Sequence, residues 1–167
     1  MSDLLLARLA AVVYEPRARM AARAPALGAR LLDWADRGGT QAALFATPGG
    51  RALVFRGTQV LSGGALGERL SDIAANLRLC AVPWAGPGRV HRGYLGALGR
   101  VRQPARRMVR EARGPVTVTG HSMGGALATL FAALAAAEGR ADGLSLVTFG
   151  APRAGNASAL ASLADRA

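Results

Sequence analysis

Residues 115–124 read Pro115-Val116-Thr117-Val118-Thr119-Gly120-His121-Ser122-Met123-Gly124. The β-branched residues before Gly120 predict a strand over residues 115–119, and the Ala- and Leu-rich residues 126–138 predict a buried helix. A tight turn joins the two elements. Residues 144–149 predict the next strand. Strand, helix and strand at this spacing indicate a βαβ unit, whose two strands are parallel neighbours.

The turn around Ser122 has the Gly-x-Ser-x-Gly pattern of a nucleophile elbow. A direct turn from strand into helix strains the serine backbone, and Gly120 and Gly124 let strand and helix pass without a Cβ clash. The free N–H groups of the helix start then point to where an oxyanion would form, with Met123 N–H as the first donor. A glycine-rich helix start can produce the same letters by chance. The strand before and the buried helix after favour a true elbow.

The beginning of the chain predicts helices. Apolar residues recur three and four apart over residues 3–13 and 18–34, which indicates one or two amphipathic helices. Pro16 separates them, and Pro25 is a possible second break. This N-terminal helical region, residues 1–38, is expected to precede the sheet.

The middle of the chain predicts a hairpin and a long helix. Residues 41–47 and 51–55 are short apolar runs joined by a Pro-Gly-Gly turn, and residues 77–82 are a weaker strand candidate. Residues 92–113 predict a helix that Pro104 bends or interrupts. With 167 residues, one domain is expected, with its core over residues 40–160.

Five sequence blocks stand in a fixed order along the chain: Phe55-Arg56-Gly57-Thr58, Ser71-Asp72-Ile73-Ala74-Ala75-Asn76-Leu77, Val90-His91-Arg92-Gly93-Tyr94, Gly120-His121-Ser122-Met123-Gly124-Gly125 and Thr148-Phe149-Gly150-Ala151-Pro152-Arg153-Ala154-Gly155-Asn156. In order and spacing they resemble the class 3 (fungal-type) lipases over roughly residues 40–160. The resemblance implies an α/β-hydrolase fold, a mostly parallel sheet with helices on both faces. It also implies a carboxylester hydrolase of the triacylglycerol lipase type, acting in lipid metabolism.

The same resemblance assigns the site residues. Ser122 is the expected nucleophile, and Thr58 and Met123 are the expected oxyanion-hole residues. Residues 59–77 resemble the lid of these lipases, with Asn76 beside the oxyanion-hole side chain. Ile73 stands where many members have Trp, and Ser62-Gly63-Gly64 suggests a mobile lid, so interfacial activation is not implied. The expected partner is an ester or lipid substrate, with transient contact of the lid with a lipid interface.

A serine hydrolase of this type also needs a histidine base and an acid that orients it. The chain has two histidines. His121 is expected to point away from the Ser122 hydroxyl, and His91 to form hydrogen bonds at the start of the following helix. Asp142 precedes its strand and should lie about 20 Å from Ser122. Asp165 comes before the point where the family's acid is expected.

The sequence therefore predicts a C-terminally truncated lipase, because the family's catalytic Asp and His follow the Gly155-Asn156 region. A shortened non-catalytic protein that keeps the elbow is an alternative. A patatin-like Ser/Asp hydrolase would need no histidine, and Asp142-Gly143 superficially resembles its Asp-Gly element. That aspartate should lie far downstream, so the spacing argues against it.

The charge raises an alternative from another class. The net charge is +11, and all 21 basic residues are arginine, which is compatible with a basic module that binds anionic lipid or nucleic acid. The arginines spread along the chain, however, and the one tight group is expected to be a solvated helix face, so no nucleic acid partner is expected. That group comprises Arg100, Arg102, Arg106, Arg107, Arg110 and Arg113.

The remaining composition predicts neither a cofactor nor a metal site. Cys80 is the one cysteine, so neither an intrachain disulfide nor a thiolate metal cluster can form. The apolar run over residues 4–13 is interrupted by Arg8 and lacks a clean cleavage site, and residues 123–137 are too few to span a bilayer. Without a signal peptide or a transmembrane segment, a cytoplasmic location is the default expectation.

Overall fold

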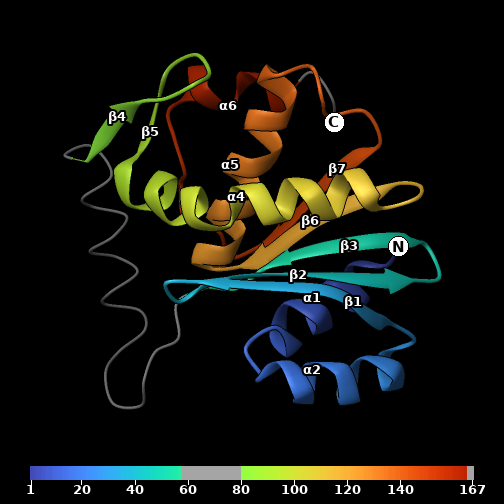
Figure 1. Cartoon of the computed structure of the whole chain (residues 1–167). Coiled ribbons are helices and arrows are strands. Elements are labelled where there is room, and N and C mark those ends of the chain that lie inside the picture. The colour runs from blue at the N-terminus through green and yellow to red at the C-terminus, as the bar shows by residue number, and fades with distance from the viewer. Residues whose placement is uncertain (58–79, 165–167) are drawn as a thin grey trace.

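The computed structural model describes residues 1–57 and 80–164 (Figure 1). In chain order the elements are α1 (Asp3–Val12), α2 (Arg17–Arg23), the 3-10 helix η1 (Ala24–Leu27), β1 (Arg30–Arg37), β2 (Thr40–Thr47), β3 (Gly50–Phe55), β4 (Ala81–Pro83), β5 (Arg89–His91), α4 (Arg92–Glu111), β6 (Val116–His121), α5 (Met123–Ala137), β7 (Leu144–Phe149) and α6 (Ala157–Ala164). Within these ranges, no helix is both long and apolar enough to cross a membrane.

The central sheet has five strands in the order β1-β2-β3-β6-β7. Strand β2 is antiparallel to both of its neighbours, whereas β3, β6 and β7 pair in parallel. Four of the five strands therefore run in the same direction, which confirms the predicted mostly parallel sheet. The predicted βαβ unit is confirmed as well, because α5 connects the parallel neighbours β6 and β7.

Helices cover both faces of the sheet, as predicted (Figure 1). Alternate residues of β3 show how the faces divide. Leu53 and Phe55 belong to the cluster between the sheet and helices α4 and α5, and Ala52 and Val54 belong to the cluster under α1. All four side chains are fully buried. A strand buried on both faces reads as a continuous apolar run, as this one does.

The N-terminal expectation is partly wrong. Helix α1 is confirmed, but residues 30–37 form strand β1 in place of the predicted helix. Gly28 adopts a left-handed conformation, with φ of 69°, and so caps and ends η1. The residues that follow pair antiparallel with β2. This pairing overrides the helix-like spacing of the apolar residues, so the helical region expected over residues 1–38 ends at Leu27.

The other predicted elements match more closely. Strands β2 and β3 form the predicted hairpin. Helix α4 is confirmed, and it continues through Pro104 without ending there. The described portion of the expected strand over residues 77–82 is β4, which pairs with β5, while residues 77–79 lie outside the described residues.

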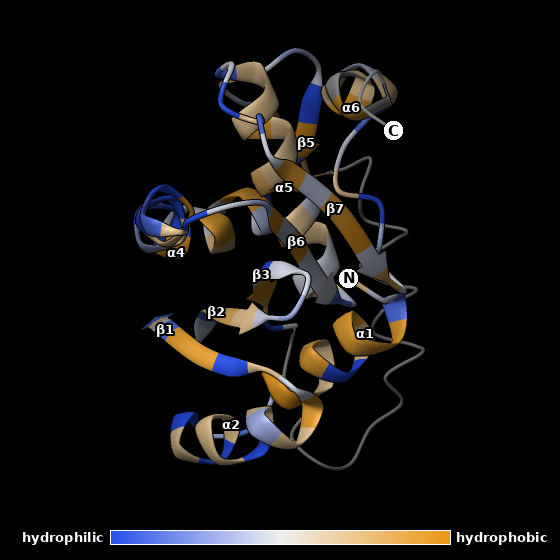
Figure 2. Ribbon diagram, turned by 90° about the vertical axis from the view of Figure 1, so that its right-hand side faces the viewer, coloured by the Kyte–Doolittle hydropathy of each residue, from blue (hydrophilic) through white to orange (hydrophobic). Residues whose placement is uncertain are grey.

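Helix α4 is amphipathic, with a hydrophilic outer side (Figure 2). The predicted solvated arginine face is confirmed for its exposed members, Arg100, Arg107, Arg110 and Arg113. It is wrong for Arg106, whose side chain is only 19% exposed and forms an ion pair with Glu138 at the end of α5. A largely buried arginine requires such a partner, because an unpaired charge would lose its hydration without compensation.

Candidate active site

Ser122 lies between the end of β6 and the start of α5 in a strained backbone conformation. Its φ is 55° and its ψ is −128°, and no other described non-glycine residue has a positive φ. Such a conformation costs on the order of 1–3 kcal/mol and persists only where its surroundings enforce it. Here Ser122 N donates to Phe149 O over 2.9 Å, and Ser122 O accepts from Gly125 N over 2.9 Å.

Glycines surround Ser122 because backbone segments meet without room for side chains. A Cβ on Gly120 would lie 2.4 Å from the Gly124 carbonyl carbon, and a Cβ on Gly124 would lie 2.2 Å from the Phe55 carbonyl oxygen. Both distances are far below any allowed contact. The predicted reason for these two glycines is therefore confirmed. The strand, turn and helix have the geometry of a nucleophile elbow, while the chemical role of Ser122 stays a prediction.

The first half of the expected oxyanion hole is described by the structure, and the second half is not. Met123 is the first residue of α5, so its backbone N–H belongs to the first turn of that helix. The backbone of residues 55–57 packs directly against Gly124, since a Cβ on Gly124 would lie 2.9 Å from Gly57 N. Thr58 comes next in the chain, but it lies outside the described residues. The same holds for the expected lid over residues 59–77, which includes Ile73 and Asn76.

Tyr14, directly after α1, joins the elbow to the segment that leads to Thr58. Its hydroxyl is 3.3 Å from Nδ1 of His121, and the Gly57 backbone hydrogen-bonds the same hydroxyl. The Arg56 guanidinium lies 5.7 Å from the ring centroid. Burial raises the pKa of Tyr14, and the Gly57 hydrogen bond and the Arg56 charge act in the opposite direction. Tyr14 therefore stays a neutral hydroxyl that can hold both partners.

Sequence reasoning missed Tyr14, although it included its partners Arg56, Gly57 and His121 in the family-like blocks. A single tyrosine at the end of an amphipathic helix carries no local pattern. The available signal was indirect. Gly57 lies so close to Tyr14 that a Cβ there would be 2.2 Å from the hydroxyl, so a glycine before the expected oxyanion-hole residue implies a close neighbour.

Each histidine ring forms a hydrogen bond with a group other than Ser122, and the bond predicted for His91 at the start of the following helix is confirmed. His121 bonds Tyr14 on the α1 side of the sheet, whereas Ser122 is the N-cap of α5, which lies on the opposite side (Figure 1). His91 is the N-cap of α4, and its Nδ1 accepts from Tyr94 N over 3.3 Å. Burial lowers the pKa of His91, which favours the neutral acceptor form. Neither ring is placed by these contacts as a base for Ser122.

The acids do not complete a triad in the described residues. Val116 pairs with Leu144, and His121 pairs with Phe149, so the whole length of β6 and β7 separates Asp142 from Ser122. This confirms that Asp142 lies at the opposite end of the strands. Asp165 lies outside the described residues. In the same described ranges, no three His, Cys, Asp or Glu side chains come together as a metal site.

A cleft of about 630 Å³ adjoins the elbow. Its lining includes Met123, Gly57, Arg56, His91 and Tyr94. The volume falls within the range of about 300–1,000 Å³ that is common for small-molecule sites. The Tyr94 hydroxyl is buried, and among the described residues it has no hydrogen-bond partner. This cleft beside Met123 therefore has the volume of a small-molecule site.

The sequence and the fold agree with one protein family. The family model described as "Lipase (class 3)" matches residues 52–166. Lipase II from Rhizopus niveus superposes with a TM-score of 0.71 at 22% identity, over 98% of this chain and 66% of that chain. The native Rhizomucor miehei lipase propeptide complex gives 0.64 at 22% identity, over 95% and 54%.

A third structure, described as a triacylglycerol lipase whose catalytic centre is formed by a serine protease triad, gives a TM-score of 0.68 at 24% identity. The match covers 92% of this chain and 62% of that chain. The chain thus spans about half to two thirds of the length of these lipases. It belongs to the class 3 lipase family and has the α/β-hydrolase fold.

Proposed function

We propose that this chain takes part in carboxylester hydrolysis of the triacylglycerol lipase type, in lipid metabolism, with Ser122 as the nucleophile. One observation carries the proposal: Ser122 alone, among the described non-glycine residues, is held at positive φ, and it is held there between a parallel strand and a buried helix. Strain of this kind is maintained at functional positions, because it costs stability without any structural gain.

The proposed reaction begins with attack of Ser122 Oγ on the ester carbonyl carbon, while the hydroxyl proton passes to a base. The negative charge that forms on the carbonyl oxygen is stabilised by the N–H of Met123 and by the N–H and hydroxyl of Thr58. Collapse of this intermediate releases the alcohol, which takes the proton. Water then hydrolyses the acyl-enzyme, so that the acid is released and Ser122 is restored.

The contacts of Tyr14 support this arrangement. Its hydroxyl bonds the residue before Ser122 and the residue before Thr58 at the same time. It can therefore fix the distance between the two expected oxyanion donors. Removal of one oxyanion donor costs about 10²–10³-fold in rate, so small displacements of either donor matter. The cleft lined by Met123 and Gly57 supplies the room for the acyl or alcohol group.

The base is the limiting element of the proposal. The described hydrogen bonds of the His91 and His121 rings go to groups other than Ser122. The 167 residues alone are therefore expected to hydrolyse p-nitrophenyl esters barely above background. An oxyanion hole and binding without a triad leave only about 10³–10⁴-fold catalysis over water. We also propose that residues 59–77, the expected lid, make transient contact with a lipid interface.

The experiment compares this chain with a chimera that adds the C-terminal segment of a complete class 3 lipase. The chimera should hydrolyse p-nitrophenyl esters orders of magnitude faster, and Ser122→Ala should abolish that gain. His121→Asn in the chimera should lower the rate no more than Tyr14→Phe does, because His121 bonds Tyr14 and not the nucleophile. Fast turnover by the original chain that depends on Ser122 would show that the base is misassigned, and His91 would be the first residue to test.

A second candidate follows from the histidine contacts. A lipase-like protein without catalysis would keep the fold but have no base for Ser122. The hydrogen bonds of His91 and His121 to other groups are compatible with this candidate. The same chimera separates the two functions. If the folded chimera gains no Ser122-dependent hydrolysis, the elbow is a structural remnant and the non-catalytic candidate is favoured.

A further inference from the structure

A second cavity lies at the end of the molecule opposite Ser122. It is formed by the C-terminal halves of α4 and α5 and the start of β7, and its volume is about 330 Å³. Its floor includes the buried Phe131 and Leu134, each 3% exposed. Its lining also includes the largely buried Arg106 and the exposed Arg110 and Arg140. The cavity is therefore apolar at its base and cationic at its opening.

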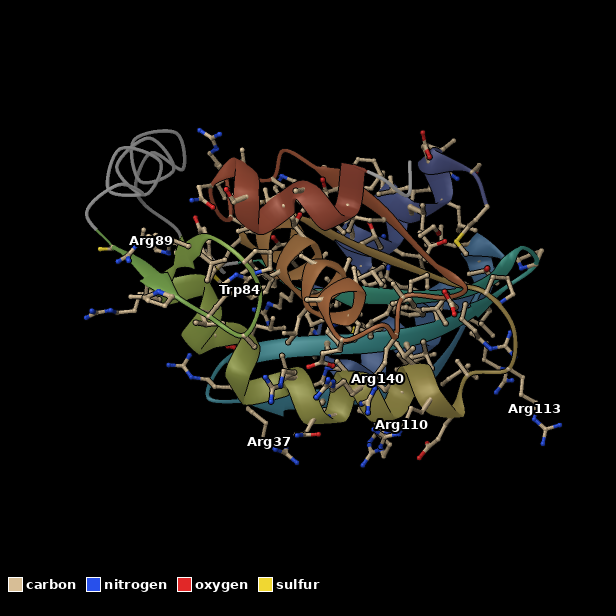
Figure 3. All side chains as sticks on the ribbon, turned by 90° about the horizontal axis from the view of Figure 1, so that it is seen from above. Arg37, Trp84, Arg89, Arg110, Arg113 and Arg140 are labelled. Carbon is tan, nitrogen blue, oxygen red and sulfur yellow. The ribbon has the colours of Figure 1, made fainter. Side chains whose placement is uncertain are left out.

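The charges at the rim do not cancel. Three arginines line the cavity, and Glu138 is the one acidic residue that lines it. Glu138 is already paired with Arg106. Figure 3 shows Arg110 and Arg140 beside one another, the first on α4 and the second just after α5. Like charges held at one opening repel each other, and a bound anion would relieve this repulsion.

The pKa of Arg106 also indicates an excess of positive charge at this cavity. Burial lowers the pKa of its guanidinium, and the positive charges of Arg102, Arg140 and Arg110 lower it further. Arg140 has a reason of its own for its position, because cations are stabilised at a helix C-terminus such as that of α5. The helix C-terminus explains the position of Arg140, but it does not explain why three arginines line one cavity.

We propose that this cavity binds a free amphiphilic anion of the carboxylate class, with its head group at Arg110 and Arg140 and its alkyl chain over Phe131 and Leu134. The guanidinium groups match the planar carboxylate through paired hydrogen bonds. The volume lies at the lower end of the range for small-molecule sites, about 300–1,000 Å³, which favours a short or medium alkyl chain. This site is separate from the proposed catalytic site and needs no chemistry at Ser122.

The test uses octanoate as the probe and isotope-labelled chain carrying Ser122→Ala, with binding followed by amide chemical shifts and calorimetry. Saturable binding is expected, with the largest shifts over residues 131–140 and not around Met123. Acetate supplies the head group alone and 1-octanol the chain alone, and each should bind at least about tenfold more weakly. Equal binding of octanoate and 1-octanol would overturn the proposal.

Variants then test the rim. The double variant Arg110→Gln and Arg140→Gln should weaken octanoate binding by roughly tenfold or more, because both charge-assisted hydrogen bonds are lost. Arg113→Gln is the control for the loss of one positive charge, since Arg113 follows α4 and lies apart from the cavity (Figure 3). Unchanged binding in the double variant, or equal loss in the control, would contradict the site.

Anionic phospholipid vesicles form the last arm. The free anion is expected to bind without a membrane, and vesicles should not shift the signals of residues 131–140 more than octanoate does. If vesicles alone shift these signals and octanoate does not, the arginines serve a membrane surface and the proposed cavity ligand is wrong. Saturable octanoate shifts around Met123 alone would likewise assign binding to the catalytic cleft and overturn this inference.

Discussion

The glycines of the elbow and those of helix α4 look alike in the sequence and differ completely in the structure. A Cβ added to Gly120 or Gly124 would lie within 2.5 Å of backbone atoms of another segment. A Cβ added to Gly96 or Gly99 would meet nothing within 4 Å. The chain has 22 glycines, so glycine content alone identifies no site. Close approach of two backbones distinguishes Gly120 and Gly124, which flank Ser122, from Gly96 and Gly99.

The largest expected effect is that of Gly124→Ala. The new Cβ would collide with the carbonyl oxygen of Phe55, so we expect a loss of about 3 kcal/mol in the free energy of unfolding. Gly96→Ala is the matched control, and it should add about 1 kcal/mol, because alanine favours the helix and nothing obstructs it. Urea titration of both variants checks the prediction. Equal changes in the free energy of unfolding would show that Gly124 is no more restricted by its neighbours than Gly96.

The strain at Ser122 can be measured by comparing two substitutions. Ser122→Ala removes the hydroxyl and keeps the Cβ at φ of 55°, whereas Ser122→Gly also removes the Cβ. We expect Ser122→Gly to be more stable than Ser122→Ala by about 1 kcal/mol, after the entropy cost of glycine in the unfolded chain. The two melting curves test this directly. A less stable glycine variant would show that the elbow stores no strain at Ser122.

Two tyrosines provide a third comparison. The Tyr14 hydroxyl has hydrogen-bond partners, whereas the buried Tyr94 hydroxyl has none within residues 1–57 and 80–164. Tyr14→Phe should therefore lower the free energy of unfolding by about 1 kcal/mol, and Tyr94→Phe should leave it unchanged or raise it. In the chimera described above, Tyr14→Phe should reduce kcat more than it raises KM. The role of Tyr14 in positioning is refuted if both variants behave alike.

The smallest expected effect concerns pH. Burial lowers the pKa of His91 below the usual 6.5, so the folded state binds this proton less readily than the unfolded state. The resulting stability is fully present above about pH 6.5 and is lost as the pH falls through the lower folded-state pKa. His91→Asn keeps a capping acceptor and removes the titration. The free energy of unfolding, measured from about pH 7.5 down to about pH 5, should fall more steeply for the parent chain, and parallel curves would exclude this effect.

The sequence was sufficient to predict the structure where a few neighbouring residues determine it. The strand, turn and helix around Ser122 were predicted correctly, since the strained turn needs glycines at fixed positions beside it. Strand β1 was missed because pairing with β2, which lies later in the chain, determines its conformation. The inward turn of Arg106 was missed for a similar reason. Its partner, Glu138, is at the end of another helix, and no local spacing reveals a contact of this kind.

The measurement that tests the central claim most directly is a crystal structure of the chimera after reaction with an alkylphosphonate ester. The account predicts one covalent adduct, on Ser122, with a phosphonyl oxygen about 3 Å from the backbone nitrogens of Met123 and Thr58. A displaced segment around Thr58 would still leave the contact with Met123. An adduct on another residue, or a Ser122 adduct whose oxygen contacts neither nitrogen, would contradict the assignment of Ser122 and its oxyanion hole.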